Sequence, residues 1–261
     1  MIILLLGAPG AGKGTQSELL SDRLGMVHVA SGDLLRDHRR RGTELGKMAD
    51  EYIKVGHLVP DDVVIKMILH RLKAADCVHG VILDGFPRTV VQAEALDANL
   101  GLSGRRVNKA LYIKVSHDTL LDRLSGRWIC RNCQASFHEK FNPPRVDGVC
   151  DVCGGQLYQR DDDKREVAED RLRVFYDETF PVIGYYRQHD SLVEMDGEQD
   201  IERVTHDLMH AIGRTAELDG SHPATPAANG HTSEVAPLHV VGHGHISSSP
   251  PFVGEGLGER S

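Results

Sequence analysis

A glycine-rich loop near the start of the chain constrains the fold more than any other feature of the sequence. The loop reads Gly7-Ala8-Pro9-Gly10-Ala11-Gly12-Lys13-Gly14-Thr15 and follows a short apolar run, residues 1–6. Such glycines let backbone N–H groups converge on anionic oxygens, and a helix that starts there adds its positive end. Between a buried strand and a helix, the loop predicts a phosphate-binding site in which Lys13 reaches the β- and γ-phosphates. The residue after Lys13 is Gly14 instead of the usual Ser or Thr, and Thr15 follows one place later.

Short apolar runs and amphipathic stretches alternate along most of the chain. This alternation predicts an α/β fold, in which a parallel sheet is covered by helices on both faces. Asp61 follows Pro60 and is expected to cap the helix that starts there. The expected strands are residues 1–6, 80–84, 109–115 and 192–195, with residues 27–30 as a short strand or a loop. The expected helices are residues 14–24, 33–40, 46–54, 61–73, 89–100, 117–124, 167–176, 181–189 and 201–212.

Four cysteines interrupt this alternation. Cys130-x-x-Cys133 and Cys150-x-x-Cys153 form two close pairs, a spacing that suits a tetrahedral zinc site with each pair on a tight turn. Residues 126–163 around them are rich in Cys, Gly, Pro and aromatic residues, with strand-like pieces such as 135–138. We expect a small β-rich insertion held together by zinc. Metal-bound thiolates fit a reducing compartment, so we expect a cytoplasmic protein. The fifth cysteine, Cys77, is expected to be a small buried hydrophobe.

Two further segments carry polar residues next to predicted strands. Asp84 ends the strand 80–84, at the sheet edge where the phosphate-binding loop also lies, and is well placed to hold Mg²⁺ through water. Arg88 offers a planar fork that suits a phosphate group. The segment from Ser31 to Arg36 indicates little alone, because Ser31 also suits a helix cap and Arg36 a solvated surface.

Four arginines flank the insertion: Arg123 and Arg127 at its entrance, Arg160 and Arg171 near its exit. Converging arginines stabilise the charge of a transferring phosphoryl group once water is excluded. The acids at 161–163 are alternative partners for some of them. Even so, four arginines around one insertion favour a role in phosphoryl transfer.

The charge and the end of the chain limit the choice of partners. A net charge of −8 argues against general nucleic-acid binding, which a basic field usually supports. No apolar run approaches the length that crosses a bilayer, so we expect neither a nucleic-acid nor a membrane partner. Residues 215–261 are rich in Gly, Pro, Ser, Ala and His, and we expect a disordered tail there.

Taken together, the phosphate-binding loop, the segments 31–36 and 84–88, Gln92 and the arginine-flanked four-cysteine insertion resemble adenylate kinase. More narrowly, they resemble the long-lid, zinc-bearing bacterial form, over residues 1 to about 213. The resemblance implies a P-loop kinase that transfers a phosphoryl group reversibly from ATP to AMP, giving two ADP, with Mg²⁺. It also implies a monomer and a division into a core (residues 1–29, 60–125 and 164–214), an AMP-binding segment (30–59) and a zinc-binding lid (126–163).

The resemblance also assigns roles to individual residues. It implies catalytic charges at Lys13, Arg88, Arg123, Arg127, Arg160 and Arg171. It implies ATP contacts at Gly10, Ala11, Gly12, Lys13, Gly14, Thr15, Arg123, Arg127, Ser136, Phe137 and Gln199. It implies AMP contacts at Ser31, Arg36, His57, Leu58, Val59, Gly85, Phe86, Pro87, Arg88, Gln92, Arg160 and Arg171.

The chain departs from the family pattern in three places. Ser31 stands where Thr is common, Trp128 stands where a second lid arginine often follows Arg127, and the tail has no counterpart. Two other functions compete. One is another nucleoside monophosphate kinase, which would use UMP/CMP or dTMP as the acceptor. The other is a nucleotide-regulated protein that uses its zinc knuckle to bind a partner; Asn108-Lys109 lacks the Asp of a guanine-reading motif, which argues against a GTPase switch.

Overall fold

The chain is built around a parallel five-stranded sheet. The structure is a computed structural model, and it describes residues 1–213. Each strand runs parallel to its neighbours in the order β2-β3-β1-β4-β8. All five residues of β1 are buried, and consecutive strand residues point to opposite faces, so both faces of the sheet are covered. The strands are β1 (Ile2–Leu6), β2 (Val27–Ala30), β3 (Val81–Asp84), β4 (Lys109–Lys114) and β8 (Leu192–Asp196). The predicted α/β fold is confirmed.

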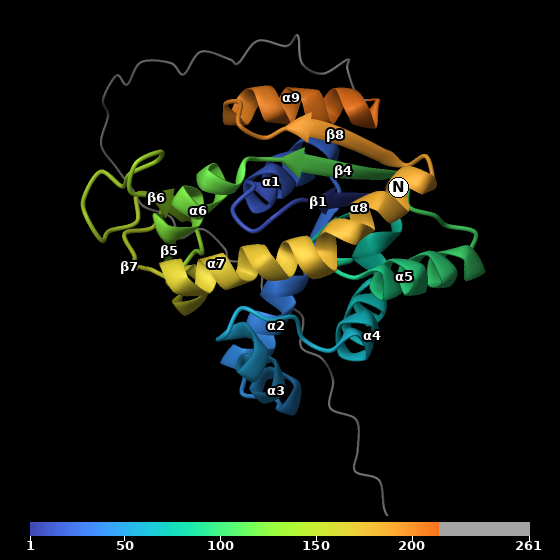
Figure 1. The fold of residues 1–261 in the computed structure, drawn as a ribbon, viewed down its shortest axis with the longest axis horizontal. Helices are drawn as coiled ribbons and strands as arrows, with labels where there is room; N and C mark the ends of the chain where they lie inside the picture. Colours follow the sequence, from blue (N-terminus) through green and yellow to red (C-terminus); the bar gives the residue numbers. More distant parts are fainter. Residues whose placement is uncertain (214–261) are drawn as a thin grey trace, which may run out of the picture. The chain divides into compact units, whose positions relative to one another are not determined.

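Nine α-helices follow or connect these strands within residues 1–213 (Figure 1). α1 contacts β1, β2 and β3 and packs against α9, while α5 packs against α4 and α8. None of the described helices is both long and apolar enough to cross a membrane. The helices are α1 (Lys13–Leu24), α2 (Ser31–Arg40), α3 (Glu44–Ile53), α4 (Asp61–Arg71), α5 (Val90–Leu102), α6 (His117–Ser125), α7 (Arg165–Val174), α8 (Phe180–Gln188) and α9 (Ile201–Ile212).

A second, three-stranded antiparallel sheet occupies the cysteine-rich insertion. Its strands are β5 (Arg127–Cys130), β6 (Ser136–His138) and β7 (Leu157–Tyr158), in the order β6-β5-β7. Figure 1 shows them beside α6 and apart from the five-stranded sheet. The sequence predicted β6, whereas β5 and β7 are too short and irregular for alternation to reveal. The predicted disordered tail, residues 215–261, lies outside the described residues.

Capping residues show how the local sequence sets where several helices begin. Thr43, Thr89 and Asp200 each accept a hydrogen bond from a backbone N–H of the helix that follows, as good N-caps do. The expectation that Asp61 caps α4 is wrong. Pro60 occupies the capping position, and among the described residues no side chain caps this helix. The Asp61 carboxylate instead accepts hydrogen bonds from Gln92 Nε2 at 2.7 Å and Thr89 Oγ1 at 3.0 Å, which tie α4 to α5.

The last two predicted helices before β8 are joined more closely than expected. A π-helical turn, Phe175–Thr179, runs directly from α7 into α8, which has a proline in its first turn. The sequence predicted two separate helices, residues 167–176 and 181–189, and a proline in the first turn is common where a helix starts. Wide turns of this kind are often found at functional sites. Here Phe175 and Thr179 line a pocket next to the phosphate-binding loop.

Candidate active site

The parallel sheet brings three motifs that are far apart in the sequence to the carboxyl-terminal edge of its strands. Leu5 of β1 pairs with Asp84 of β3, which in turn pairs with Ala30 of β2. The carboxyl ends of these strands are therefore neighbours, and the loop after each starts at the same edge. The phosphate-binding loop follows β1, Ser31 follows β2 and Gly85 follows β3. Topological edges of this kind are the usual ligand sites of open α/β sheets.

The phosphate-binding loop leads into a helix whose first N–H groups are uncapped, and it contains a lysine with a lowered pKa. Gly12 takes a left-handed backbone conformation at the start of α1, and among the described residues no side chain caps that helix. Its first N–H groups are thus left for an anion. Lys13 Nζ donates to the carbonyl oxygens of Gly7 and Ala8, each at 2.9 Å. Burial, together with the charges of Arg88 and Arg171, lowers the pKa of Lys13 to about 8.

Asp84 lies beside the loop as an ionised carboxylate. Burial opposes its charge, but His28 and Lys13 outweigh that cost and hold the pKa of Asp84 below its usual range. His28 Nε2 lies 3.6 Å from Asp84 Oδ2, which is an ion-pair distance and too long for a direct hydrogen bond. Burial likewise opposes the charge on His28, yet Asp84 raises the pKa of His28. An ionised carboxylate at this edge suits a hydrated divalent cation.

Two pockets open at this edge, and we name each after one residue. The Ser31 pocket is bounded on one side by α2 and the loop before α4, and the Lys13 pocket lies against the phosphate-binding loop. Both share Gly56, Leu58, Gly85, Arg88 and Arg171. The predicted AMP-contact residues that line the Ser31 pocket are Ser31, Arg36, His57, Leu58, Val59, Gly85, Arg88, Gln92 and Arg171. Pro87 lines the Lys13 pocket, whereas Phe86 is fully buried.

The polar groups of the Ser31 pocket are held by the loop after β3. Ser31 Oγ donates to Gly85 O at 2.6 Å, and Arg88 Nε donates to the same oxygen at 2.8 Å. The side-chain amide of Gln92 accepts from Arg88 N at 2.8 Å and donates to Asp61. Burial and the nearby charge of Arg171 lower the pKa of Arg88 to about 10. A bound anion is therefore expected to stabilise the charged form of this buried arginine.

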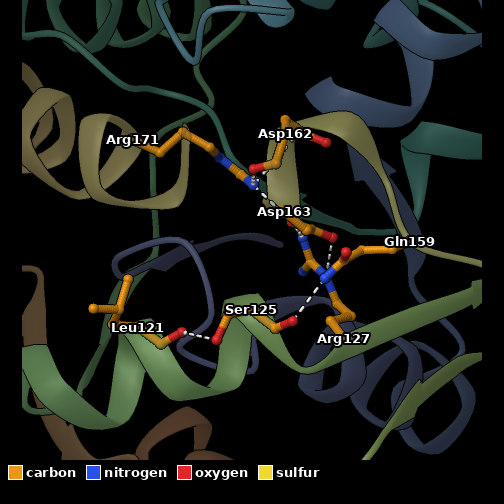
Figure 2. A network of polar contacts seen from close by, with 7 residues as sticks. All are labelled: Leu121, Ser125, Arg127, Gln159, Asp162, Asp163 and Arg171. Carbon is orange, nitrogen blue, oxygen red and sulfur yellow. Dashed lines mark hydrogen bonds and ion pairs between the residues drawn. The ribbon is translucent and has the colours of Figure 1, made fainter. Parts of the chain in front are cut away.

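Two arginines at the insertion meet one buried acid (Figure 2). Asp163 is 0% exposed; Arg127 Nε donates to its Oδ2 at 2.8 Å, and Arg171 Nη1 donates to its Oδ1 at 2.8 Å. Arg171 Nη1 also donates to Asp162 O at 2.7 Å. Gln159 Nε2 donates to Ser125 O at 2.6 Å, which ties the end of the insertion to the end of α6. The acids thus hold the arginines between the insertion and α7.

The other predicted lid and ATP residues are less closely gathered. Arg123 donates from Nη1 and Nη2 to Gly197 O, each at 3.1 Å, two residues from Gln199. Burial and the charges of Arg36 and Arg127 lower the pKa of Arg160. Its buried Nε has no hydrogen-bond partner among the described residues. Ser136 is exposed, but Phe137 is buried against Cys130 and Leu157 in the insertion. Their ATP contacts stay predictions.

The four cysteines of the insertion come together as the spacing predicted. Their sulfur atoms all lie within 4.8 Å of one another, and two of the Sγ–Sγ distances, Cys130–Cys153 and Cys133–Cys150, are 3.5 Å. Four sulfurs about 2.3 Å from one tetrahedral metal ion are separated by roughly 3.8 Å, so the donor set fits zinc. Backbone N–H groups of Cys133 and Asn132 lower the pKa of Cys130 to about 6, whereas the neighbouring sulfur atoms raise the pKa of Cys133 to about 12. Thiols crowded in this way would be stabilised as thiolates by a bound cation. The cluster can therefore bind a metal ion such as zinc.

Several site residues escaped the sequence reasoning. Asp163 was noted only as one of three possible arginine partners, and its complete burial has no local signal. Gly56, His28 and Thr179 carry no motif. A helical hydrophobic pattern places Leu35, Ile53 and Val64 on inner faces, but only the structure shows that they line the Ser31 pocket. Cys77 is fully buried, as predicted.

The fold and this edge define a P-loop nucleotide-binding protein with a second ligand pocket beside the phosphate-binding loop. Comparison with known proteins narrows that class. The family model described as adenylate kinase matches residues 5–191. An adenylate kinase of Caldicellulosiruptor bescii is 50% identical over 213 residues, covering 82% of this chain and 99% of that protein. One from Methanocella arvoryzae is 47% identical over 216 residues, covering 83% of this chain and 100% of that protein. The chain belongs to the adenylate kinase family.

Proposed function

We propose that the protein transfers the γ-phosphoryl group of ATP reversibly to AMP, giving two ADP. The observation that carries this proposal is the pair of pockets that share Arg88 and Arg171. A donor triphosphate at the phosphate-binding loop and an acceptor monophosphate in the Ser31 pocket would direct their reacting phosphates at the same arginines. Transfer between two bound nucleotides needs this proximity more than it needs a catalytic base.

The chemistry follows from the charges at this edge. An oxygen of the AMP phosphate attacks the γ-phosphorus, and the bond from that phosphorus to the β–γ bridging oxygen breaks, so that both products are ADP. The bridging oxygen leaves with the electron pair, and Lys13 would neutralise that charge. The lowered pKa values of Lys13 and Arg88 support this role, because both groups are cations in a buried, cation-rich site. Bound phosphates would remove that repulsion.

The remaining residues take roles by position. Gly10 to Thr15 would hold ATP phosphates with the open start of α1, and Ser31, Arg36 and Gln92 would hold AMP. Arg123, Arg127, Arg160 and Arg171 would close over the transferring group. Ser136, Phe137 and Gln199 would contact ATP, the buried Phe137 through its backbone. We propose that the chain divides into a core (1–29, 60–125 and 164–214), an AMP-binding segment (30–59) and a lid (126–163), and that it acts as a monomer in the cytoplasm.

Two metal ions complete the proposal. Asp84 would hold Mg²⁺ through water, and the ion supplies charge neutralisation on the ATP phosphates when it is bound. Zinc on Cys130, Cys133, Cys150 and Cys153 would hold the shape of the lid and take no part in the reaction. The cluster lies within the insertion, with Cys130 at the end of β5 and the other three cysteines outside the strands, which supports a structural role.

A coupled assay for ADP tests the proposal directly. ATP is offered together with one acceptor, AMP, UMP, CMP or dTMP. Of these four acceptors, we expect only AMP to give rapid ADP formation. Arg88→Ala should remove most of this activity because it empties both pockets of a shared cation. Arg40→Ala is a matched control, since that side chain is 80% exposed and, within residues 1–213, pairs only with Asp37. A faster rate with UMP, CMP or dTMP would assign the enzyme to another monophosphate class, and no transfer to any acceptor would reject the kinase function.

A further inference from the structure

Gly56 lies where the two pockets meet, yet it has no side chain to offer a ligand. It follows α3 in the segment 30–59 and lines both the Ser31 pocket and the Lys13 pocket. Its φ of +78° lies in the left-handed region, and its backbone N–H donates to Ile53 O at 3.1 Å, which closes a turn. The turn geometry explains a glycine there only in part, because Asn also tolerates this conformation.

The space beside Gly56 is filled by α7. A Cβ atom on residue 56 would lie 2.9 Å from Arg171 Cγ, 3.3 Å from Val167 Cγ1 and 3.4 Å from Val167 O. The first of these distances is shorter than a carbon–carbon contact allows, so one of the two residues would have to move. The stem of Arg171 therefore lies directly against the bare Cα of Gly56.

Arg171 has little freedom to give way. Its Nη1 is held by Asp162 O at 2.7 Å and by Asp163 Oδ1 at 2.8 Å, while Asp163 also accepts from Arg127. Its side chain is thus fixed at both ends, by the acids at the guanidinium and by Gly56 at the stem. A side chain on residue 56 would either push the guanidinium off the acids or push the segment 30–59 away from α7.

We propose that Gly56 is a positioning residue for phosphoryl transfer, and that its missing side chain sets where Arg171 lies between the two pockets. This inference rests on the proposed role of Arg171 in the reaction. Gly56 itself would touch no reacting atom. It acts by letting the segment that forms the Ser31 pocket approach α7 closely enough for one arginine to line both pockets.

The test compares Gly56→Ala with Gly42→Ala. Gly42 also has a positive φ, +64°, in the same segment, but a Cβ there would meet nothing within 4 Å, and it lines neither described pocket. Both variants carry the same kind of backbone strain, and only one clashes with Arg171. We expect kcat to fall by about tenfold or more in Gly56→Ala relative to Gly42→Ala, because misplacing a catalytic group by about 1 Å can cost about a hundredfold. The KM values for AMP and ATP should change less than kcat.

A second pair of variants separates the clash from the strain. Gly56→Asn and Gly42→Asn place a residue that tolerates positive φ at each position, so Gly56→Asn remains usable if Gly56→Ala does not fold. Circular dichroism and thermal unfolding check that each variant is folded. Gly56→Asn should still lose kcat relative to Gly42→Asn. Equal kcat in the two members of both pairs would overturn the proposal.

A double-mutant cycle identifies the partner. Arg171→Ala removes Cγ, so Gly56→Ala should cost little more in that background, whereas in Arg171→Lys, which keeps the stem, the cost should persist. An equal loss from Gly56→Ala with and without the stem would reject a role through Arg171. If Arg171→Ala alone left turnover unchanged, the proposed role of Arg171 would fail instead, so the two failures are distinguishable.

Discussion

The five-stranded core and the cysteine-rich insertion are stabilised by different means. The core cluster includes fully buried Leu4, Ile82 and Leu111 together with apolar side chains from every strand of the sheet. The insertion's own cluster has only Cys130, Phe137, Cys150 and Leu157, and two of these four are thiols. Apolar burial of about 25 cal/mol per Å² can stabilise the first region alone, but it yields little in the second. The insertion therefore depends on whatever holds its sulfur atoms together.

The largest expected effect concerns chemistry in the core. Lys13→Met should lower kcat by about a hundredfold to a thousandfold, the usual cost of removing one charge-stabilising donor from an active site. Unfolding stability should stay the same or rise, because Lys13 is a desolvated cation near Arg88 and Arg171. Steady-state ADP formation and thermal unfolding measure the two effects. Lys47→Met, at an exposed position, is the control. A parallel loss of activity and stability would contradict a purely chemical role.

Metal removal should affect the insertion and spare the core. We expect chelation, or Cys133→Ser, to lower the temperature at which activity is lost, while the main unfolding transition of the sheet stays within a few degrees of its original value. Binding energy at a structural thiolate site is folding energy for its own domain. Hydrogen exchange of the amides in β5 and β6 measures the insertion, and circular dichroism measures the core.

The same experiment can break this comparison. If the metal-free protein lost all turnover at low temperature while β5 and β6 stayed protected from exchange, the metal would have to act in the reaction. If chelation unfolded the whole chain in one transition, the two regions would not be separately stabilised.

The sequence predicted those parts of the molecule that depend on neighbours along the chain. The phosphate-binding loop and the four-cysteine cluster both rest on local spacing, and the sheet rests on apolar runs. Ser31 shows the limit of this reasoning. Alone it suits a helix cap, and it lies in the site only because β2 pairs with β3, which places Ser31 Oγ on Gly85 O.

Side-chain partners across long separations were not predictable. Asp61 turns away from its own helix toward Gln92, and His28 lies beside Asp84, because packing of distant elements decides where each side chain points. Burial of Asp163 between two arginines follows from how α7 leaves the insertion. The π-helical turn at Phe175–Thr179 likewise depends on packing, since its residues have no unusual local propensity.

A smaller effect compares packing in the two regions. Ile82→Ala should lower the free energy of unfolding by about 2–5 kcal/mol, as large-to-small changes in a buried core do. Leu157→Ala should leave that global value nearly unchanged and act on the insertion alone, because its few apolar neighbours are there. Chemical denaturation gives the first quantity, and hydrogen exchange in β5 gives the second. A similar global loss from Leu157→Ala would show that the two clusters unfold together.

The smallest expected effect is a pH dependence that also differs between the regions. Lys13 has its pKa lowered to about 8, whereas Asp163, working against burial, raises the pKa of Arg127 above its ordinary value. Above pH 8 the free enzyme therefore loses charge at the phosphate-binding loop while Arg127 in the insertion stays charged. Since bound phosphate favours protonated Lys13, ATP affinity should fall above pH 8, by at most about tenfold per pH unit for one proton. Titration calorimetry in two buffers of different ionisation enthalpy should detect proton uptake on binding.

The sign for folding is opposite to the sign for binding. Between pH 8 and the ordinary lysine pKa of 10.5, the unfolded chain keeps a proton that folded Lys13 has lost. The contribution of this group to the free energy of unfolding thus rises with pH across that window, while ATP affinity falls. Lys13→Arg keeps the charge and should lose both dependences. Arg127 stays charged across this window. Both dependences should therefore remain in Arg127→Gln, which adds no titratable group, and their loss in that variant would show that the titrating group is in the insertion and not in the core.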